Sequence, residues 1–250
     1  MPFEKDTLVY VNFTAKVKDT GEAIETTLED EAKKLEIHDP GRRYEPRLVA
    51  VGEEWVLKGL DEEIAKMEVG EKKVAELPPE KAWGDRDPSL LRMIPMRKFG
   101  EKADDMMVGD VVEIDDRPAV VRFIGSGRAQ VDFNHRLAGK TLSYEVEVTQ
   151  KVGPGDETVR ALIKRRFPGE DSKVPFSQEG GDLTIDIPEA AFLAEGLQII
   201  KRGISNDVLK FVPAVNTVIF REVYPRKEPA KAEPKKAAET QAEASPPKAT

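Results

Sequence analysis

Apolar and polar residues alternate along several short stretches of the chain, a pattern typical of strands that bury one face. The longest stretches cover residues 8–17 and 142–148, where every second side chain is apolar. Residues 183–187 repeat the alternation over a shorter length, and residues 48–51 and 74–77 are brief apolar runs. We expect residues 142–148, although distant in sequence, to complete a sheet that residues 8–17 begin.

Other apolar residues recur at intervals of three or four, which is the spacing of one face of a helix. One such set consists of Val56, Leu60, Ile64 and Met67. The set stops at Gly70, and glycine commonly follows the last turn of a helix. After a boundary at residues 153–155, we expect Asp156 to cap a second helix. Residues 189–202 predict a third helix that is interrupted near Gly196.

The pattern differs between residues 87 and 132, where short apolar groups are separated by turn residues such as Asp115-Asp116. Strands joined by hairpins explain this block better than helices do. The last 25 residues hold mostly Ala, Lys, Glu and Pro, which cannot bury enough surface to become ordered. We therefore predict an α+β chain in four parts: a first domain of residues 1–86 and 133–150, an inserted all-β domain of 87–132, a separate α+β domain of 151–225, and a disordered tail of 226–250.

The composition excludes several kinds of site. The chain has 250 residues, no Cys and two His, which rules out thiolate metal sites and cysteine nucleophiles and leaves little room for a catalytic triad. We expect no metal and no cofactor. Lys and Arg number 39 against 47 Asp and Glu, and the net charge of −8 argues against a general nucleic-acid binder. No stretch approaches about 18 consecutive apolar residues, so we expect a cytoplasmic protein without a membrane span.

Three stretches of sequence resemble the motifs of one known family. Residues 51–64 read VGEEWVLKGLDEEI, residues 78–84 read PPEKAWG, and residues 134–148 read NHRLAGKTLSYEVEV. Their order and spacing resemble those of the FKBP-type peptidyl-prolyl cis-trans isomerases. The separation of the last two stretches matches the subgroup in which a chaperone domain replaces a flap loop, the SlyD-like arrangement. The additional domain after residue 152 is similar to that of the long, archaeal-type members.

The resemblance implies a bent antiparallel sheet that half-wraps a short helix, with an apolar pocket for a proline ring between them. The positions that match the family's pocket are Phe13, Ile24, Glu25, Val56, Leu57, Leu60, Trp83 and Tyr144. Leu60 matches the floor under the proline ring, and the backbone N–H of Leu57 matches the donor to a ligand carbonyl. The chain departs from the family at Glu25, where Asp is usual, and at Trp83, where Tyr is usual.

The implied reaction breaks no bond, which suits a chain so poor in His and Cys. It rotates an X–Pro amide over a barrier near 20 kcal/mol, and an apolar cavity disfavours the planar amide, whose charges are separated, relative to the twisted one. The resemblance thus implies a peptidyl-prolyl cis-trans isomerase with chaperone activity that accelerates the folding of proline-containing chains. The alternative is a holdase that binds unfolded polypeptide with little or no turnover because of Glu25 and Trp83.

Methionines concentrate in the inserted block, which the resemblance implies to be the chaperone domain. We expect its chain-binding face to contain Met93, Ile94, Met96, Phe99, Met106 and Met107. Flexible Met suits a surface that accepts varied partners, although Met also fills the cores of small domains. The expected partners are unfolded or proline-containing polypeptides and a macrolide of the type this family binds. Apolar residues on both faces of residues 215–224 predict a homodimer through the C-terminal domain.

Overall fold

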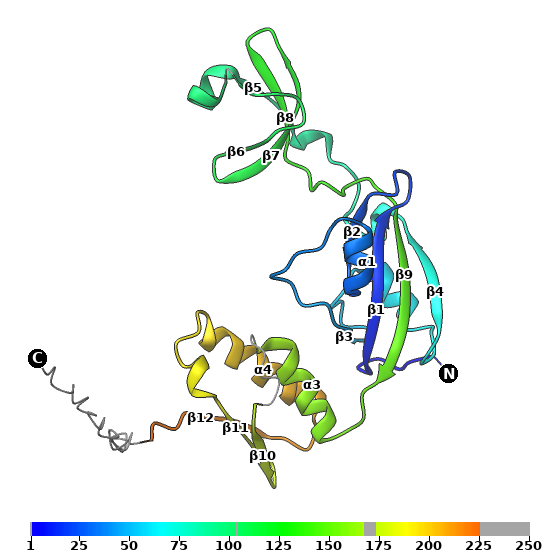
Figure 1. The fold of residues 1–250 in the computed structure, drawn as a ribbon, viewed down its shortest axis with the longest axis vertical. Coiled ribbons are helices and arrows are strands. Elements are labelled where there is room, and N and C mark those ends of the chain that lie inside the picture. The colour runs from blue at the N-terminus through cyan, green and yellow to red at the C-terminus, as the bar shows by residue number, and fades with distance from the viewer. Residues whose placement is uncertain (1, 104, 168–173, 226–250) are drawn as a thin grey trace, which may run out of the picture.

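The computed structural model describes residues 2–103, 105–167 and 174–225. These residues have an α+β fold with three separate sheets, as the sequence predicts. Figure 1 shows a central sheet, a second sheet at one end of the molecule and a third, C-terminal sheet at the other end. The predicted tail, residues 226–250, lies outside the described residues. Among the described residues, no helix combines the length and the apolar character needed to cross a bilayer.

The central sheet has five strands, and each is antiparallel to its neighbour. The strands are β1 (Leu8–Val17), β2 (Ala23–Thr26), β3 (Arg47–Ala50), β4 (Lys72–Leu77) and β9 (Leu142–Lys151). β1 pairs with β2, β3 and β9, and its register with β9 runs from Val9 opposite Lys151 to Val17 opposite Leu142. The prediction that residues 142–148 complete the first sheet is therefore confirmed. The sequence pattern does not reveal β2, because four residues are too few to display an alternation.

Successive side chains of β1 enter two different apolar cores. Val9, Val11 and Phe13 belong to the core that also buries one face of α2 (Lys58–Ile64). Leu8 is buried in the core of the C-terminal part, and Tyr10 packs against that second core. Since neighbouring residues of a strand point to opposite faces, one end of the central sheet is covered on both sides. The remaining helical segment of this region, α1 (Glu29–Lys34), follows β2 in sequence.

The helix α2 is shorter than the apolar spacing predicts. Val56 precedes it, and the helix begins only at Lys58 because Leu57 has an extended backbone, with φ −55° and ψ 140°. The buried residue Gly59 explains the close approach of α2 to β4 and to the short helix η1 (Pro79–Lys81), because a Cβ at this position would lie 2.8 Å from the Leu77 side chain. Only glycine allows this separation without a shift of the neighbouring residues.

The inserted block is a four-stranded antiparallel sheet in the order β5-β8-β7-β6. Its elements are η2 (Pro88–Leu90), β5 (Leu91–Pro95), η3 (Met96–Ala103), β6 (Val111–Ile114), β7 (Arg117–Gly125) and β8 (Arg128–Asp132). Two-residue turns join β6 to β7 through Asp115-Asp116 and β7 to β8 through Ser126-Gly127, and all four residues have positive φ. This is the backbone that favours tight hairpins, so the predicted hairpin block is confirmed.

The C-terminal part places two helices over a three-stranded sheet (Figure 1). Its elements are α3 (Asp156–Arg166), β10 (Phe176–Glu179), β11 (Asp182–Asp186), η4 (Glu189–Ala191), α4 (Leu197–Phe211) and β12 (Thr217–Arg221). The expectation that Asp156 caps α3 is wrong: Gly155, with φ 72°, occupies the N-cap, and Asp156 is the first helical residue. Gly196, with φ 74°, separates η4 from α4 and confirms the predicted interruption.

Candidate functional site

Three side chains from three elements form the floor of the candidate pocket. Phe13 comes from β1, Leu60 from α2 and Tyr144 from β9, and their exposed fractions are 1%, 1% and 4%. The centroids of the Phe13 and Tyr144 rings lie 5.6 Å apart, with the ring planes inclined by 49°. All three belong to one apolar core, so the structure brings together three of the sequence-predicted pocket residues.

The rim of this floor contains Ile24, Val56 and Leu57, which are partly buried and pack against the same core. Leu57 immediately precedes α2, so its N–H is one of the donors that a helix cannot satisfy internally. Within the described part of the chain, the structure gives this N–H no acceptor. An amide donor thus lies unpaired beside an apolar surface.

The loop that carries Val56 and Leu57 is fixed by Asp61. This buried carboxylate accepts hydrogen bonds from the N–H of Gly52, at 3.0 and 3.1 Å, and from the N–H of Glu54, at 2.9 Å. Hydrogen bonds to an ionised acceptor are about twice as strong as neutral ones. Asp61 therefore positions the rim, although the sequence pattern does not single it out.

Glu25 is tied into a cationic network and is not a freely solvated carboxylate. Its Oε2 accepts from Arg42 Nη2 at 3.0 Å and from Arg47 Nη2 at 3.1 Å. The Arg47 guanidinium carbon also lies 4.7 Å from the centroid of the Phe13 ring, a cation–π contact. Glu25 and Tyr144 both pair in register with Ala15 on β1, so their side chains share one face of the sheet. Sequence reasoning does not find the two arginines, because they lie outside any periodic pattern.

The Tyr144 hydroxyl is available to a ligand. None of the hydrogen bonds among the described residues involves it, and no buried side-chain nitrogen or oxygen there lacks a partner, so the hydroxyl must reach the surface. Burial of the ring raises the pKa of Tyr144, the nearby Glu25 raises it further, and Arg47 opposes the rise. Tyr144 therefore keeps its proton well into the alkaline range and can donate a hydrogen bond.

Trp83 occupies a different environment from the other candidate residues. Its side chain is 46% exposed, and its ring stacks on that of His135 with centroids 3.9 Å apart and planes inclined by 18°. His135 Nδ1 accepts a hydrogen bond from the N–H of Leu137 at 3.3 Å, and desolvation together with Arg136 lowers the pKa of His135. Trp83 is not among the residues that pack against the core of Phe13, Leu60 and Tyr144, so the structure does not group it with the other candidate residues.

The family model described as FKBP-type peptidyl-prolyl cis-trans isomerase matches residues 2–149, more than half of the chain. The chain belongs to this family. A second family model, described as FKBP26_C-terminal, matches residues 155–225. The protein is therefore an FKBP-type isomerase with an additional C-terminal region that has a family model of its own.

Relatives of this FKBP-type isomerase cover its N-terminal part. The short-type peptidyl-prolyl cis-trans isomerase of Methanocaldococcus jannaschii is 34% identical over 145 residues, which is 58% of this chain and 91% of the relative. The FKBP-type 16 kDa isomerase of Escherichia coli K12 is 28% identical over 151 residues, 59% of this chain and 92% of the relative. The isomerase SlyD of Aeromonas hydrophila is 35% identical over 131 residues, 50% of this chain and 59% of the relative.

In this FKBP-type isomerase, the inserted block is anchored where its two connections meet the central domain. The Asp87 N–H donates to Asn134 Oδ1 at 2.9 Å, and Asn134 Nδ2 donates back to the Asp87 carbonyl at 3.0 Å. The buried Asp132 accepts from the Asn134 N–H at 2.9 Å and forms ion pairs with Arg86 and Arg122. The Asp87–Asn134 bonds join the two connections of the block, and the Asp132–Arg86 ion pair links its last strand to the preceding connection.

The apolar residues of the inserted block divide into core and surface. Ile94, Met96, Phe99 and Met106 are partly buried and pack against a small core of Ala119, Val121, Ala129 and Val131. Met93 and Met107 are exposed, as are Val108, Val111 and Phe123. The sequence counts Val111 and Phe123 among the apolar positions of the block, but it gives no sign that they face solvent. That each of the six predicted face residues contacts polypeptide stays a prediction.

Proposed function

We propose that the protein rotates X–Pro amides of polypeptides at the apolar surface around Phe13, Leu60 and Tyr144. The observation that supports this proposal is the combination of a dry floor with two unpaired donors at its edge, the Leu57 N–H and the Tyr144 hydroxyl. The proline ring would lie on Leu60, and the donors would hold the substrate carbonyls. No side chain with an accessible nucleophile or a proton to exchange is needed.

The energy that the site must supply is small. The uncatalysed barrier is near 20 kcal/mol, and an acceleration of about 10⁴-fold requires about 5.5 kcal/mol of differential stabilisation. Resonance in the planar amide separates charge, and twisting about the C–N bond reduces that separation. An apolar surface therefore destabilises the planar ground state relative to the twisted state, while a fixed donor holds the carbonyl in place.

We propose in addition that the inserted block holds unfolded chain beside the site. Its exposed apolar residues, among them Val111 and Met107 at 73% and 68% exposure, support this role because unfolded chains expose apolar segments of varied sequence. The hydrogen bonds between Asp87 and Asn134 keep the block close to the isomerase domain. A chain held there meets the pocket at a raised effective concentration.

The decisive experiment measures cis–trans exchange in a tetrapeptide containing Phe-Pro, by NMR exchange spectroscopy. Micromolar full-length protein should accelerate the exchange, and a macrolide of the type this family binds should reduce the effect. The alternative function, a holdase with little or no turnover, predicts no acceleration together with suppressed aggregation of an unfolded protein. Glu25 and Trp83, at positions where the family usually has Asp and Tyr, make this comparison necessary.

A second experiment separates holding from catalysis. Replacing residues 88–131 with a short loop should slow the catalysed refolding of a proline-limited protein while sparing the tetrapeptide. The double variant Met107→Ser, Phe123→Ser should act in the same direction without removing the block. Val74→Ser on β4, whose side chain is also exposed, is the matched control. Equal losses on both substrates would contradict the coupling of the two activities.

We also propose that two copies associate through the C-terminal part. β12 supports this because Val218 and Phe220 pack against the core, whereas Ile219 between them is exposed, as is Val223 just after the strand. Sedimentation velocity of the wild type against a chain of residues 1–150 tests the proposal. A monomeric wild type at tens of micromolar would contradict it.

A further inference from the structure

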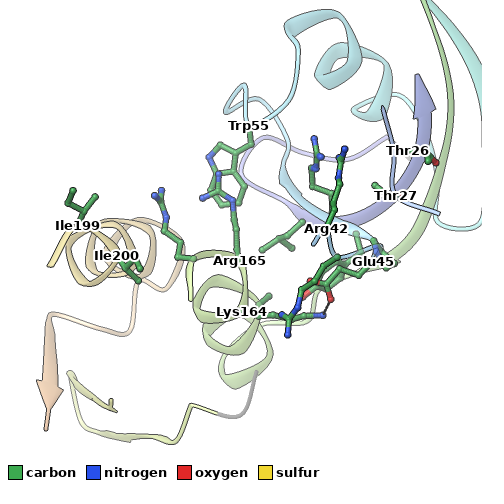
Figure 2. Close-up of a pocket in the computed structure, with 16 residues that line it drawn as sticks. Thr26, Thr27, Arg42, Glu45, Trp55, Lys164, Arg165, Ile199 and Ile200 are labelled. Carbon is green, nitrogen blue, oxygen red and sulfur yellow. Dashed lines mark ion pairs between the residues drawn. The ribbon is translucent and has the colours of Figure 1, made fainter. Parts of the chain in front are cut away.

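A cleft of about 510 Å³ lies between the central domain and the C-terminal part. Figure 2 shows Arg42 and Glu45 on the side of the central domain, and Lys164 and Arg165 on α3 opposite them. None of the sequence-predicted site residues lines this cleft. Its walls combine positive charge with apolar surface, and the two properties together define what it can bind.

The charge of the cleft is opposite to that of the chain. Six cationic side chains line it: Arg42, Arg43, Arg47, Lys164, Arg165 and Arg166. Three carboxylates pair with five of them: Glu25 with Arg42 and Arg47, Glu45 with Lys164, and Asp207 with Arg165 and Arg166. Arg43 has no ion-pair partner within the described part of the chain. The cluster therefore carries a net charge of +3 in a protein whose net charge is −8.

Apolar groups lie among these cations. The guanidinium carbon of Arg165 is 3.6 Å from the centroid of the Trp55 ring, and Trp55 in turn meets Phe211 of α4 edge-on at 5.4 Å. Ile199 and Ile200 of α4 also line the cleft, and Ile199 is 77% exposed. Burial and the neighbouring Arg166 lower the pKa of Arg165, so a cation is held here in a partly desolvated place.

We propose that this cleft binds an acidic stretch of polypeptide in which Asp or Glu residues alternate with apolar ones. The cations would pair with the carboxylates, while Trp55 and Ile199 would contact the apolar side chains. A bare phosphate ion would leave those apolar contacts unused. Nucleic acid fits poorly because the protein as a whole is acidic and would repel a long polyanion.

The chain's own residues 226–250 do not fit the cleft on charge. They contain six basic and four acidic residues, a net charge of +2, so the positive cleft would repel them. A separate acidic polypeptide is therefore the occupant that charge complementarity favours. Since Arg47 lines the cleft and also contacts Phe13 and Glu25, a chain bound here would run beside the isomerase site.

The two tryptophans of the chain give a local reporter for the cleft. Trp83 and Trp55 are the only ones, so the full-length variant Trp83→Phe leaves Trp55 as the single fluorophore inside the proposed site. The probes are an acetylated and amidated ten-residue peptide of alternating Glu and Leu, the same peptide with Lys in place of Glu, inorganic phosphate and a single-stranded oligonucleotide. None of the peptides contains proline, so the result does not depend on isomerase turnover.

The acidic peptide should change the Trp55 emission with micromolar affinity, and 0.5 M salt should weaken the binding roughly tenfold because exposed charges are screened. In that background, Arg43→Glu should weaken binding on the order of three- to tenfold, since this arginine has no carboxylate partner to lose. Arg128→Glu, the same charge change at an exposed arginine of β8, should leave the affinity unchanged.

Three results would overturn the proposal. The first is no Trp55 response to the acidic peptide. The second is equal or tighter binding of phosphate, the oligonucleotide or the Lys peptide, which would assign the cleft to another ligand or to none. The third is an equal loss of affinity in Arg43→Glu and Arg128→Glu, which would show that binding follows net charge and not the cleft. If a charge-reversed variant folds poorly, the proposal is still tested by titrating the probes into the Trp83→Phe protein, because that protein carries no charge reversal.

Discussion

The rings of Phe13 and Tyr144 are diagonal neighbours across the pairing of β1 with β9, with centroids 5.6 Å apart. The pair is buried, yet the hydroxyl of Tyr144 reaches the surface without a partner among the described residues. A single side chain thus supplies apolar floor through its ring and a donor through its tip. Removing this one oxygen atom therefore tests the proposed role of the hydroxyl while leaving the buried ring in place.

Tyr144→Phe should leave the fold intact and slow isomerisation. The free energy of unfolding should change by less than about 0.5 kcal/mol, because no hydrogen bond within the protein is lost. The kcat/KM for a proline tetrapeptide should fall roughly tenfold, the effect of one hydrogen bond to the substrate. Tyr10→Phe on the opposite face of β1 is the control and should retain full activity. Urea unfolding and NMR exchange measure the two quantities, and unchanged activity in Tyr144→Phe would remove the hydroxyl from the site.

Leu60 and Ile64 offer a matched pair one turn apart on α2. Both are fully buried in the same core, so Leu60→Ala and Ile64→Ala should each lower the free energy of unfolding by about 3 kcal/mol. Only Leu60→Ala should also reduce the activity of the folded fraction, because only Leu60 is assigned to the proline ring. Equal specific activities after correction for the folded fraction would refute that assignment.

Much of the floor can be predicted from sequence. The alternation of residues 8–17 and 142–148 places Phe13 and Tyr144 on buried strand faces, and the spacing of the 56–67 set places Leu60 on the buried face of a helix. The pattern does not predict the second core. It places Leu8 and Tyr10 on the solvent-facing side of β1, whereas the C-terminal part covers them. The period of the apolar residues predicts which side chains are buried. It does not predict which other part of the chain buries them.

The polar surroundings of the site could not be predicted in the same way. Arg42 and Arg47 both donate hydrogen bonds to Glu25. The chain between Glu25 and these arginines shows no regular spacing of apolar residues, so nothing in the sequence links the three side chains. The parallel pairing of β11 with β12 is hidden for a related reason, because α4 intervenes between the two strands. Ion pairs between irregular segments depend on tertiary placement, which a local pattern does not contain.

Asp61→Asn tests whether the rim must be rigid. The Gly52 N–H is shared between both carboxylate oxygens, and the Glu54 N–H bonds to one of them. In the variant an NH₂ donor replaces one oxygen and faces the Gly52 N–H, so the shared bond is lost and the remaining bonds go to a neutral acceptor. We expect a loss of about 1–3 kcal/mol in the free energy of unfolding and a higher KM for peptide, because the loop that carries Leu57 loosens. Glu62→Gln, next along the same helix, is the control, because, among the described residues, the partly exposed Glu62 pairs only with the surface residue Lys81 and does not bond to the loop. A destabilised variant with an unchanged KM would show that Asp61 supports the fold alone.

His135 provides a prediction about pH. Its pKa in the folded protein is lowered, mainly by desolvation, so the fold favours the neutral imidazole that stacks on Trp83. The contribution of this residue to stability is therefore present above the unfolded pKa of about 6.5 and is lost as the pH falls through the lower, folded value. NMR titration should place the His135 midpoint below 6.5, with His38→Asn used to assign the two imidazole signals. His135→Asn, whose Oδ1 can still accept from the Leu137 N–H, should remove this part of the pH dependence. A midpoint at or above 6.5 would contradict the prediction and would leave the stack as a contact without an effect on protonation.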